Sequence, residues 1–212
     1  MSNVTEAVAQ AKKQSKDRNF IETVELAINL KNIDLKKPEN RISLEIPLPH
    51  PLTKKTKIAI IAEGDLALRA KENADLVIQK NDLERYATDK RAAKNLADKY
   101  DFFIAQADLM PTVGKILGPA LGVRGKMPQV VPPTVADLEP IFKRMQKTIR
   151  MRLRQNPVFF AKVGTKDMSD KEISENIESI LKAVEDKLEK GHDNIRSLYV
   201  KTTMGPPVKI EI

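Results

Sequence analysis

The run KIAIIA at residues 57–62 decides the fold of the middle of the chain. Its five consecutive apolar residues, 58–62, are typical of a β-strand that is covered on both faces, as strands of parallel sheets are. Similar apolar runs return at 74–78 and 102–105, and helical patterns occupy 64–70 and 82–99. This alternation of buried strands and helices predicts βα units on a parallel, doubly wound sheet.

The flanks of this segment have a different pattern, because their apolar residues alternate with polar ones. Such alternation, as at 24–30 and 42–48, indicates strands with one exposed face. Neither flank can build a stable core alone. We therefore predict an α/β protein of two domains. Residues 1–51 and 157–212 form a discontinuous α+β domain, with helices on an antiparallel sheet, and residues 52–156 form an inserted Rossmann-like domain. The predicted hinge residues are Pro49, His50, Pro51, Asn156 and Pro157.

Composition excludes several classes of site. The 212 residues include no cysteine and only two histidines, so disulfides and histidine or thiolate metal sites are not expected. No apolar stretch reaches about 18 residues, and the polar N-terminus lacks a signal-peptide pattern. We expect a cytoplasmic protein that does not contact a membrane and needs no cofactor.

The positive charge is concentrated in the predicted insert. Residues 52–156 contain 20 Lys and Arg against 12 Asp and Glu, whereas the two flanks are nearly neutral; the net charge of the chain is +8. A polyanion such as nucleic acid would suit this surplus, although a solvated helix face explains a basic run equally well. The predicted auxiliary contacts are Lys115, Arg124, Lys126, Lys143, Arg144, Lys147 and Arg150, and the basic run continues to Arg152 and Arg154. With 4% aromatic residues, broad stacking of bases on an aromatic sheet is not expected.

The glycine-rich segment 114–126 does not fit a phosphate-binding loop. Gly125-Lys126 is followed by Met127-Pro128 instead of a hydroxyl residue that opens a helix. No dinucleotide fingerprint follows the first buried strand either. We interpret the segment as a basic, mobile loop between helices that begin at Asp108 and at Thr134-x-x-Asp137. No catalytic residues or metal ligands are predicted.

The segment 199–207 (YVKTTMGPP) is the predicted working surface. It indicates a strand, a tight turn and a further strand, because Gly205 frees the backbone and two prolines fix φ after it. Two threonine hydroxyls beside a glycine suit a sugar-phosphate partner. A hairpin turn without any binding role is the simpler alternative.

Four segments resemble the ribosomal protein L-one family, the stalk proteins of the large subunit, in its archaeal form. They are 20–25 (FIETVE), 48–50 (LPH), 114–119 (GKILGP) and 197–206 (SLYVKTTMGP), in order along the chain. The resemblance implies binding to a junction in large-subunit rRNA near the tRNA exit site, with a role in release of deacylated tRNA. It also implies repression of translation through the mRNA of the protein's own operon, and a monomer when free of the ribosome.

The resemblance and the turn motif together give a predicted RNA-binding set. Its members are Phe20, Glu22, Thr23, Glu25, Gly164, Thr165, Ser197, Tyr199, Thr202, Thr203, Met204, Gly205 and Pro206. Glu22, Thr202 and Thr203 are expected to read ribose 2′-hydroxyls, which distinguish RNA from DNA. Phe20 is expected to be partly exposed at the entrance of its strand.

Two other functions are weighed against this reading. An enzyme that uses a nucleotide or cofactor on the inserted domain lacks the glycine fingerprint and a catalytic cluster. A DNA-binding module lacks a helix-turn-helix or zinc-finger pattern. A structural RNA-binding protein is the favoured prediction.

Overall fold

The computed structural model describes residues 2–35, 42–53, 55–135, 137–153 and 155–211. The chain forms two compact units, which we call the discontinuous unit (Met1–Lys54 with Lys147–Ile212) and the inserted unit (Lys55–Gln146). One contains an antiparallel sheet and the other a parallel sheet, so the predicted α/β fold class is confirmed.

The discontinuous unit is built on a four-stranded sheet in the order β10-β9-β1-β8, in which every pair is antiparallel. A two-stranded sheet, β2-β7, lies next to β8. The elements of this unit are α1 (Ser2–Gln14), β1 (Thr23–Leu30), β2 (Ser43–Pro47), β7 (Thr148–Arg152), β8 (Val158–Thr165), α8 (Asp170–Glu185), the 3-10 turn η3 (Gly191–Asn194), β9 (Ile195–Thr202) and β10 (Val208–Ile210).

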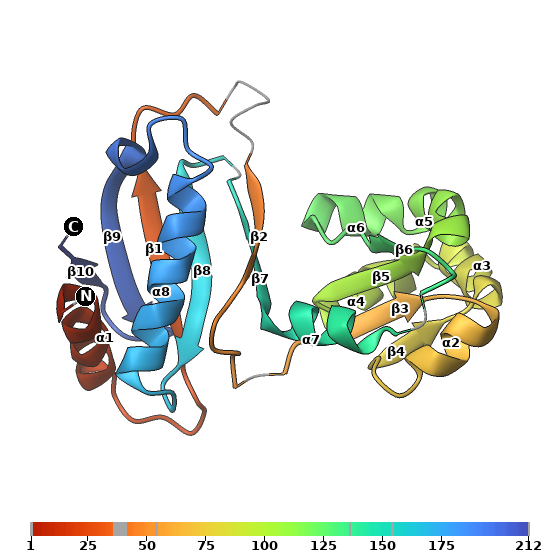
Figure 1. Ribbon diagram of the computed structural model, residues 1–212, viewed down its shortest axis with the longest axis horizontal. Coiled ribbons are helices and arrows are strands. Elements are labelled where there is room, and N and C mark those ends of the chain that lie inside the picture. Colours follow the sequence, from red (N-terminus) through yellow and green to blue (C-terminus); the bar gives the residue numbers. More distant parts are fainter. Residues whose placement is uncertain (1, 36–41, 54, 136, 154, 212) are drawn as a thin grey trace. The chain divides into compact units, whose positions relative to one another are not determined.

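One face of the four-stranded sheet is covered by helices. Alternate residues of β1 from Val24 to Leu30 are buried, and they share a core with one side of α1 and α8. Figure 1 shows α8 lying across the sheet. The helix begins at a capping box, because the Ser169 hydroxyl accepts from the amide of Glu172 and the Glu172 carboxylate accepts from the amide of Ser169. Among the described residues, no helix covers the other face of the sheet (Figure 1).

The inserted unit has a parallel sheet in the order β4-β3-β5-β6. All four residues of β3 (Ile58–Ile61) are buried, with separate apolar clusters on its two faces, as the continuous apolar run predicts. The remaining elements are α2 (Gly64–Ala70), β4 (Leu76–Ile78), α3 (Lys80–Thr88), α4 (Lys90–Lys99), β5 (Phe102–Gln106), the 3-10 turn η2 (Ala107–Leu109), α5 (Met110–Ile116), α6 (Gly118–Arg124), β6 (Gln129–Val131) and α7 (Glu139–Lys147).

The prediction of a single helix at 82–99 is wrong, because the structure has two helices there, α3 and α4. Asp89 ends α3 in an extended conformation, and its side chain accepts hydrogen bonds from the amides of Arg91 and Ala92, so the same residue caps α4. An aspartate that competes for backbone amides favours a helix start over a helix interior.

The predicted mobile loop at 114–126 is also wrong. Most of the segment is helical, in α5 and α6, with a proline in the first turn of each helix and Gly125 ending α6 at φ 67°. Proline is tolerated there because those amides lack intrahelical partners, and glycine adopts the left-handed conformation at little cost. Gly118, Pro119 and Gly125 therefore mark helix ends, whereas Gly114 and Gly122 lie inside the helices.

Two predicted helix starts are displaced. Asp108 lies inside η2 and accepts from Gln106 Nε2 (3.2 Å), so it does not cap α5. The next helix, α7, begins at Glu139, whose amide donates to Asp137 Oδ1 at 2.9 Å, and not near Thr134. The short edge strand β6 was not predicted at all.

The predicted boundary near residue 156 differs from the grouping in the structure. Residues 148–152 pair with 43–47 in the two-stranded sheet, which places them in the discontinuous unit. Apolar side chains of this sheet, such as Leu44 and Met151, join the core of that unit. The chain therefore passes between the units at 54/55 and 146/147.

Candidate nucleic-acid interface

The turn between β9 and β10 is fixed by side chains from the start of β1. The Thr203 hydroxyl accepts from the Thr23 amide (3.1 Å) and donates to the Thr23 carbonyl (3.2 Å), so it extends the pairing of β1 and β9 by one residue. The amide of Met204 donates to Glu22 Oε1 at 3.0 Å. This clamp holds the Met204 side chain 61% exposed to solvent.

Gly205 is required by close approach. A Cβ atom at this position would lie 2.3 Å from Thr202 Oγ1, far inside van der Waals contact. Thr202 is fully buried, and its hydroxyl has no hydrogen-bond partner among the described residues. Glycine thus lets the turn fold directly over the end of β9.

Glu22 holds the turn in place. Its side chain is 1% exposed, and its two oxygens accept from the Met204 amide and the Ser15 hydroxyl, while Arg18 Nε lies 3.7 Å from Oε1. The hydrogen bond from Ser15 lowers the pKa of the Glu22 carboxyl; burial opposes this, and the Met204 amide, Arg18 and Lys166 reinforce it. An ionised, fully engaged carboxylate is available to position the turn and not to bind a ligand.

Four members of the predicted RNA-binding set therefore cannot touch RNA in this structure, because they are buried: Glu22, Thr202, Thr165 and Gly164. A Cβ on Gly164 would lie 2.7 Å from Ile173 Cγ1, so this glycine permits the close packing of α8 on β8. The Thr165 hydroxyl lies 2.8 Å from that of Thr53. Glu22 and Thr202 shape the surface from beneath in this structure, and their reading of ribose hydroxyls stays a prediction.

The side of the sheet opposite α1 and α8 carries four further members of the set, Thr23, Glu25, Ser197 and Tyr199. We call it the open face. It consists of Thr23, Glu25, Ala27 and Asn29 of β1, Phe160 and Lys162 of β8, Ser197, Tyr199 and Lys201 of β9, and Lys209 of β10. The register places these residues in rows. Glu25 pairs with Lys162 and Lys201, Ala27 with Phe160 and Tyr199, and Asn29 with Val158 and Ser197. Within the last row, Asn29 Nδ2 donates to Ser197 Oγ at 2.9 Å.

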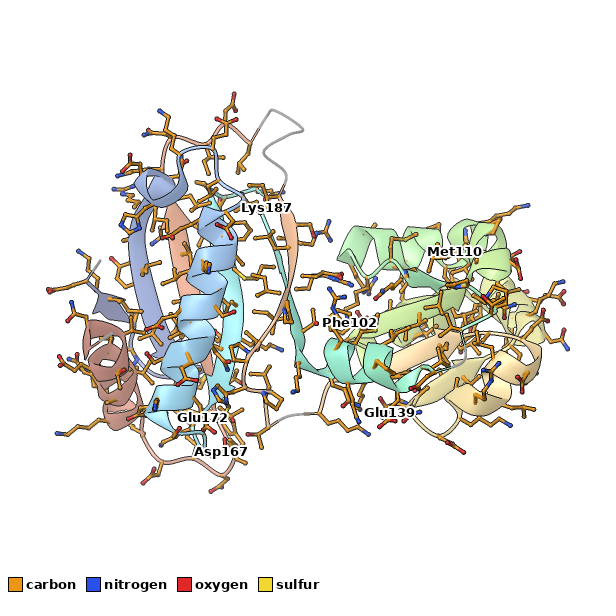
Figure 2. All side chains as sticks on the ribbon, viewed as in Figure 1. Phe102, Met110, Glu139, Asp167, Glu172 and Lys187 are labelled. Carbon is orange, nitrogen blue, oxygen red and sulfur yellow. The ribbon has the colours of Figure 1, made fainter. Side chains whose placement is uncertain are left out.

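A groove of about 510 Å³ adjoins the turn. It is lined by residues 17–22 and by Lys166 and Asp167. Phe20 is 54% exposed, which confirms the expectation of a partly exposed aromatic at the strand entrance, and Ile21 is 62% exposed. Figure 2 shows Asp167 near Glu172, at the N-terminal end of α8. The predicted set omits Ile21, which lies inside the 20–25 segment, and Lys166, which belongs to no recognisable pattern.

Comparison with known proteins identifies the family. Residues 11–206 match the family model described as "Ribosomal protein L1p/L10e family". The chain belongs to this family. It is 54% identical to the large ribosomal subunit protein uL1 of Pyrococcus abyssi (strain GE5 / Orsay), over 98% of this chain and 95% of the relative. The uL1 protein of Methanothermobacter thermautotrophicus (strain ATCC 29096 / DSM 1053 / JCM 10044 / NBRC 100330 / Delta H) is 48% identical over 98% of both chains. The resemblance to archaeal members is thus confirmed.

The distribution of charge between the two units does not support the prediction that the insert carries the whole positive surplus. The inserted unit, Lys55–Gln146, contains 15 Lys and Arg against 12 Asp and Glu, a net charge of +3, which leaves +5 of the total +8 in the discontinuous unit. The prediction that the whole surplus lies in the insert is wrong, because Lys54 and residues 147–154, which together carry five of the cations counted in 52–156, belong to the discontinuous unit; Lys54 and Arg154 themselves lie outside the described residues.

Several predicted auxiliary cations are already engaged. Arg124 makes two hydrogen bonds to Asp98 (2.6 and 2.8 Å), and the bond from Arg124 lowers the pKa of that carboxyl. Lys126 donates to the carbonyls of Ala97 and Tyr100. Arg150 and Lys143 pair with Glu45 and Glu139 respectively. Lys115, Arg144 and Lys147 are exposed. Internal pairing reduces the charge that most of these side chains can offer to a polyanion.

The predicted hinge residues are held inside the discontinuous unit. The amide of His50 donates to Asn176 Oδ1, and Asn176 Nδ2 donates to the carbonyls of His50 and Val163. The carbonyl of Pro157 accepts from the Leu30 amide at 2.8 Å, as an extension of the β1–β8 pairing. Residues 50 and 156–157 are thus anchored, and they precede or follow the points where the chain changes unit.

Two further observations concern metal-binding sites and membrane-spanning helices. Within the described residues, no group of three or more His, Cys, Asp or Glu side chains is arranged to hold a metal ion. Among the helices in the described part of the chain, none is long and apolar enough to cross a membrane.

Proposed function

We propose that this chain is a structural protein of the large subunit of the cytoplasmic ribosome, and that it binds large-subunit rRNA through the open face and the turn at 203–205. The observation that carries the proposal is the turn itself. Buried Glu22 and the close approach of Gly205 to buried Thr202 fix its backbone while Met204 is left exposed. A rigid turn with an exposed, adaptable apolar side chain suits contact with a ribose or base.

The open face supplies groups suited to the sugar edge of RNA. Thr23, Ser197 and Tyr199 carry hydroxyls that donate and accept, and Glu25 is an acceptor for a 2′-hydroxyl. Glu25 thus takes the role that the sequence suggested for Glu22. Lys162 and Lys201 flank Glu25 and favour nearby phosphates.

Two finer roles follow from the family resemblance and are part of the proposal. The chain would take part in the release of deacylated tRNA at the exit site, and it would repress translation by binding its own operon mRNA. The mRNA would present a structure similar to the rRNA junction and occupy the same surface, whereas cations of the inserted unit would attract the tRNA. The role is structural and regulatory, with no reaction catalysed by the chain and no cofactor.

A binding titration tests the proposal. The full chain is titrated at fixed salt with a transcript of archaeal large-subunit rRNA, with a small-subunit rRNA transcript and a DNA duplex as competitors. We expect specific binding to the large-subunit transcript that neither competitor removes at equal concentration. Equal affinity for all three would contradict the proposal. A transcript of the operon's own 5′ region, titrated in the same way, tests the repressor role.

A further inference from the structure

An aromatic row crosses the open face. The register aligns Phe160 of β8, Ala27 of β1, Tyr199 of β9 and Lys209 of β10 side by side. Phe160 is 68% exposed and Tyr199 is partly exposed. Ala27 between them leaves a shallow floor, with the two aromatic residues two strands apart, or about 9–10 Å at the usual strand spacing.

An exposed phenylalanine in the middle of a strand has no role in the core of its unit. Phe159, the preceding residue, is fully buried on the helix side, so β8 already supplies its core aromatic. Burying Phe160 against a ligand would recover its apolar contribution. A single exposed apolar residue is common, but here the register places Phe160 in one row with the aromatic ring of Tyr199.

The charged residues around the row indicate which kind of ligand would bind there. Lys162, Lys201 and Lys209 border the two aromatic residues, and none of the three forms an ion pair among the described residues, where Glu25 is the acidic neighbour. An apolar protein surface or a second copy of this chain would leave these lysines without partners. An RNA nucleotide satisfies both features, because its base has a flat π-face and its backbone carries phosphates.

We propose that the row of Phe160, Ala27 and Tyr199 is a stacking platform for an unpaired nucleotide of the bound rRNA, with its phosphates next to the bordering lysines. The inference rests on the proposed function and extends it, because it places a base contact where composition alone argued against aromatic stacking. The platform adds an affinity that depends on an unstacked base and not on the 203–205 turn.

The full chain offers a direct optical test, because it contains no tryptophan. In Phe160→Trp the only indole reports the platform, and we expect its emission to be quenched at saturating large-subunit rRNA transcript with affinity retained. Phe160→Ala is expected to weaken binding by about tenfold or more, as loss of one base–aromatic stack does. Phe160→Leu, which keeps apolar area without a π-face, should fall close to Phe160→Ala.

The matched control is Val123→Ala, since Val123 of α6 is 80% exposed in the inserted unit and should leave affinity unchanged. Binding by Phe160→Ala within twofold of the original chain, or unchanged emission of Phe160→Trp at saturation, overturns the platform. So does sedimentation showing that the original chain is a dimer and Phe160→Ala a monomer. If the original chain itself does not bind the transcript specifically, the proposed function fails as well. If the original chain binds and only the Phe160 variants give a contrary result, the platform alone fails.

Discussion

The discontinuous and inserted units use their polar groups in opposite ways. In the inserted unit, Arg124 and Lys126 are exposed or partly exposed cations that bind the unit's own carboxylates and carbonyls. In the discontinuous unit, the buried Glu22 carboxylate binds the Met204 amide and the Ser15 hydroxyl beneath the 203–205 turn, and the Met204 side chain is left exposed. We therefore propose that the exposed residues above this turn, and not the paired cations of the inserted unit, form the interface.

The largest expected effect comes from replacing Gly205, the glycine of the 203–205 turn. Gly205→Ala places a methyl group 2.3 Å from Thr202 Oγ1, so the turn must shift. We expect a loss of roughly 1–3 kcal/mol in the free energy of unfolding, as for overpacking of a dense site, with loss of specific rRNA binding. Thermal or urea unfolding and an RNA titration measure the two effects.

A second substitution tests the cause of that effect. Thr202→Ala removes the hydroxyl that the new methyl group would meet, and this hydroxyl has no hydrogen-bond partner to lose among the described residues. The double variant Thr202→Ala with Gly205→Ala should be more stable than the sum of the single changes predicts. Strict additivity would show that the strain lies elsewhere in the turn.

The second prediction compares two exposed apolar residues, one from each unit. Met204→Asp should weaken specific rRNA binding by roughly 1–3 kcal/mol, because it leaves a desolvated charge against the RNA. Val123→Asp adds the same charge to an exposed site of the inserted unit and should have little effect. Equal losses in the two variants would mean that overall charge, and not position, governs binding.

The third prediction concerns pH and the Glu22 clamp. The folded-state pKa of Glu22 is lowered, so its contribution to stability is complete above the ordinary carboxyl pKa and is lost as pH falls through the lower, folded-state pKa. Glu22→Gln lacks this dependence. The free energy of unfolding of the original chain should therefore fall more steeply than that of Glu22→Gln on acidification below about pH 4.5. Parallel curves would argue against the clamp.

How far the sequence predicts this molecule depends on the range of the interactions. Buried strands such as 58–61 follow from neighbouring residues, and this strand is found as predicted. The capping box at Ser169 is likewise set by neighbouring residues. The turn at 203–207 was also recognisable locally. The burial of Glu22 was not, because it is set by hydrogen bonds to Ser15 and to Met204, 182 residues away along the chain.

Misreadings in the inserted unit have a similar origin. Glycine and proline in 114–126 suggested a loop, yet they lie within or at the ends of short helices whose buried residues, such as Val113 and Leu121, pack on the sheet. Phe160 was missed because strand register, and not its own segment, brings it beside Ala27 and Tyr199.

The smallest expected change comes from removing the inserted unit. Pro47 pairs with Thr148, and the Leu48 amide donates to the Lys147 carbonyl at 2.9 Å, so the two ends of the discontinuous unit already run side by side. Deletion of 55–146 with a short flexible linker should leave specific rRNA affinity within about tenfold while reducing its salt dependence, since only screened cations are lost. Circular dichroism must first show that the shortened chain is folded. If that folded chain has lost all specific binding, the inserted unit is part of the recognition surface, and the contrast between the two units fails.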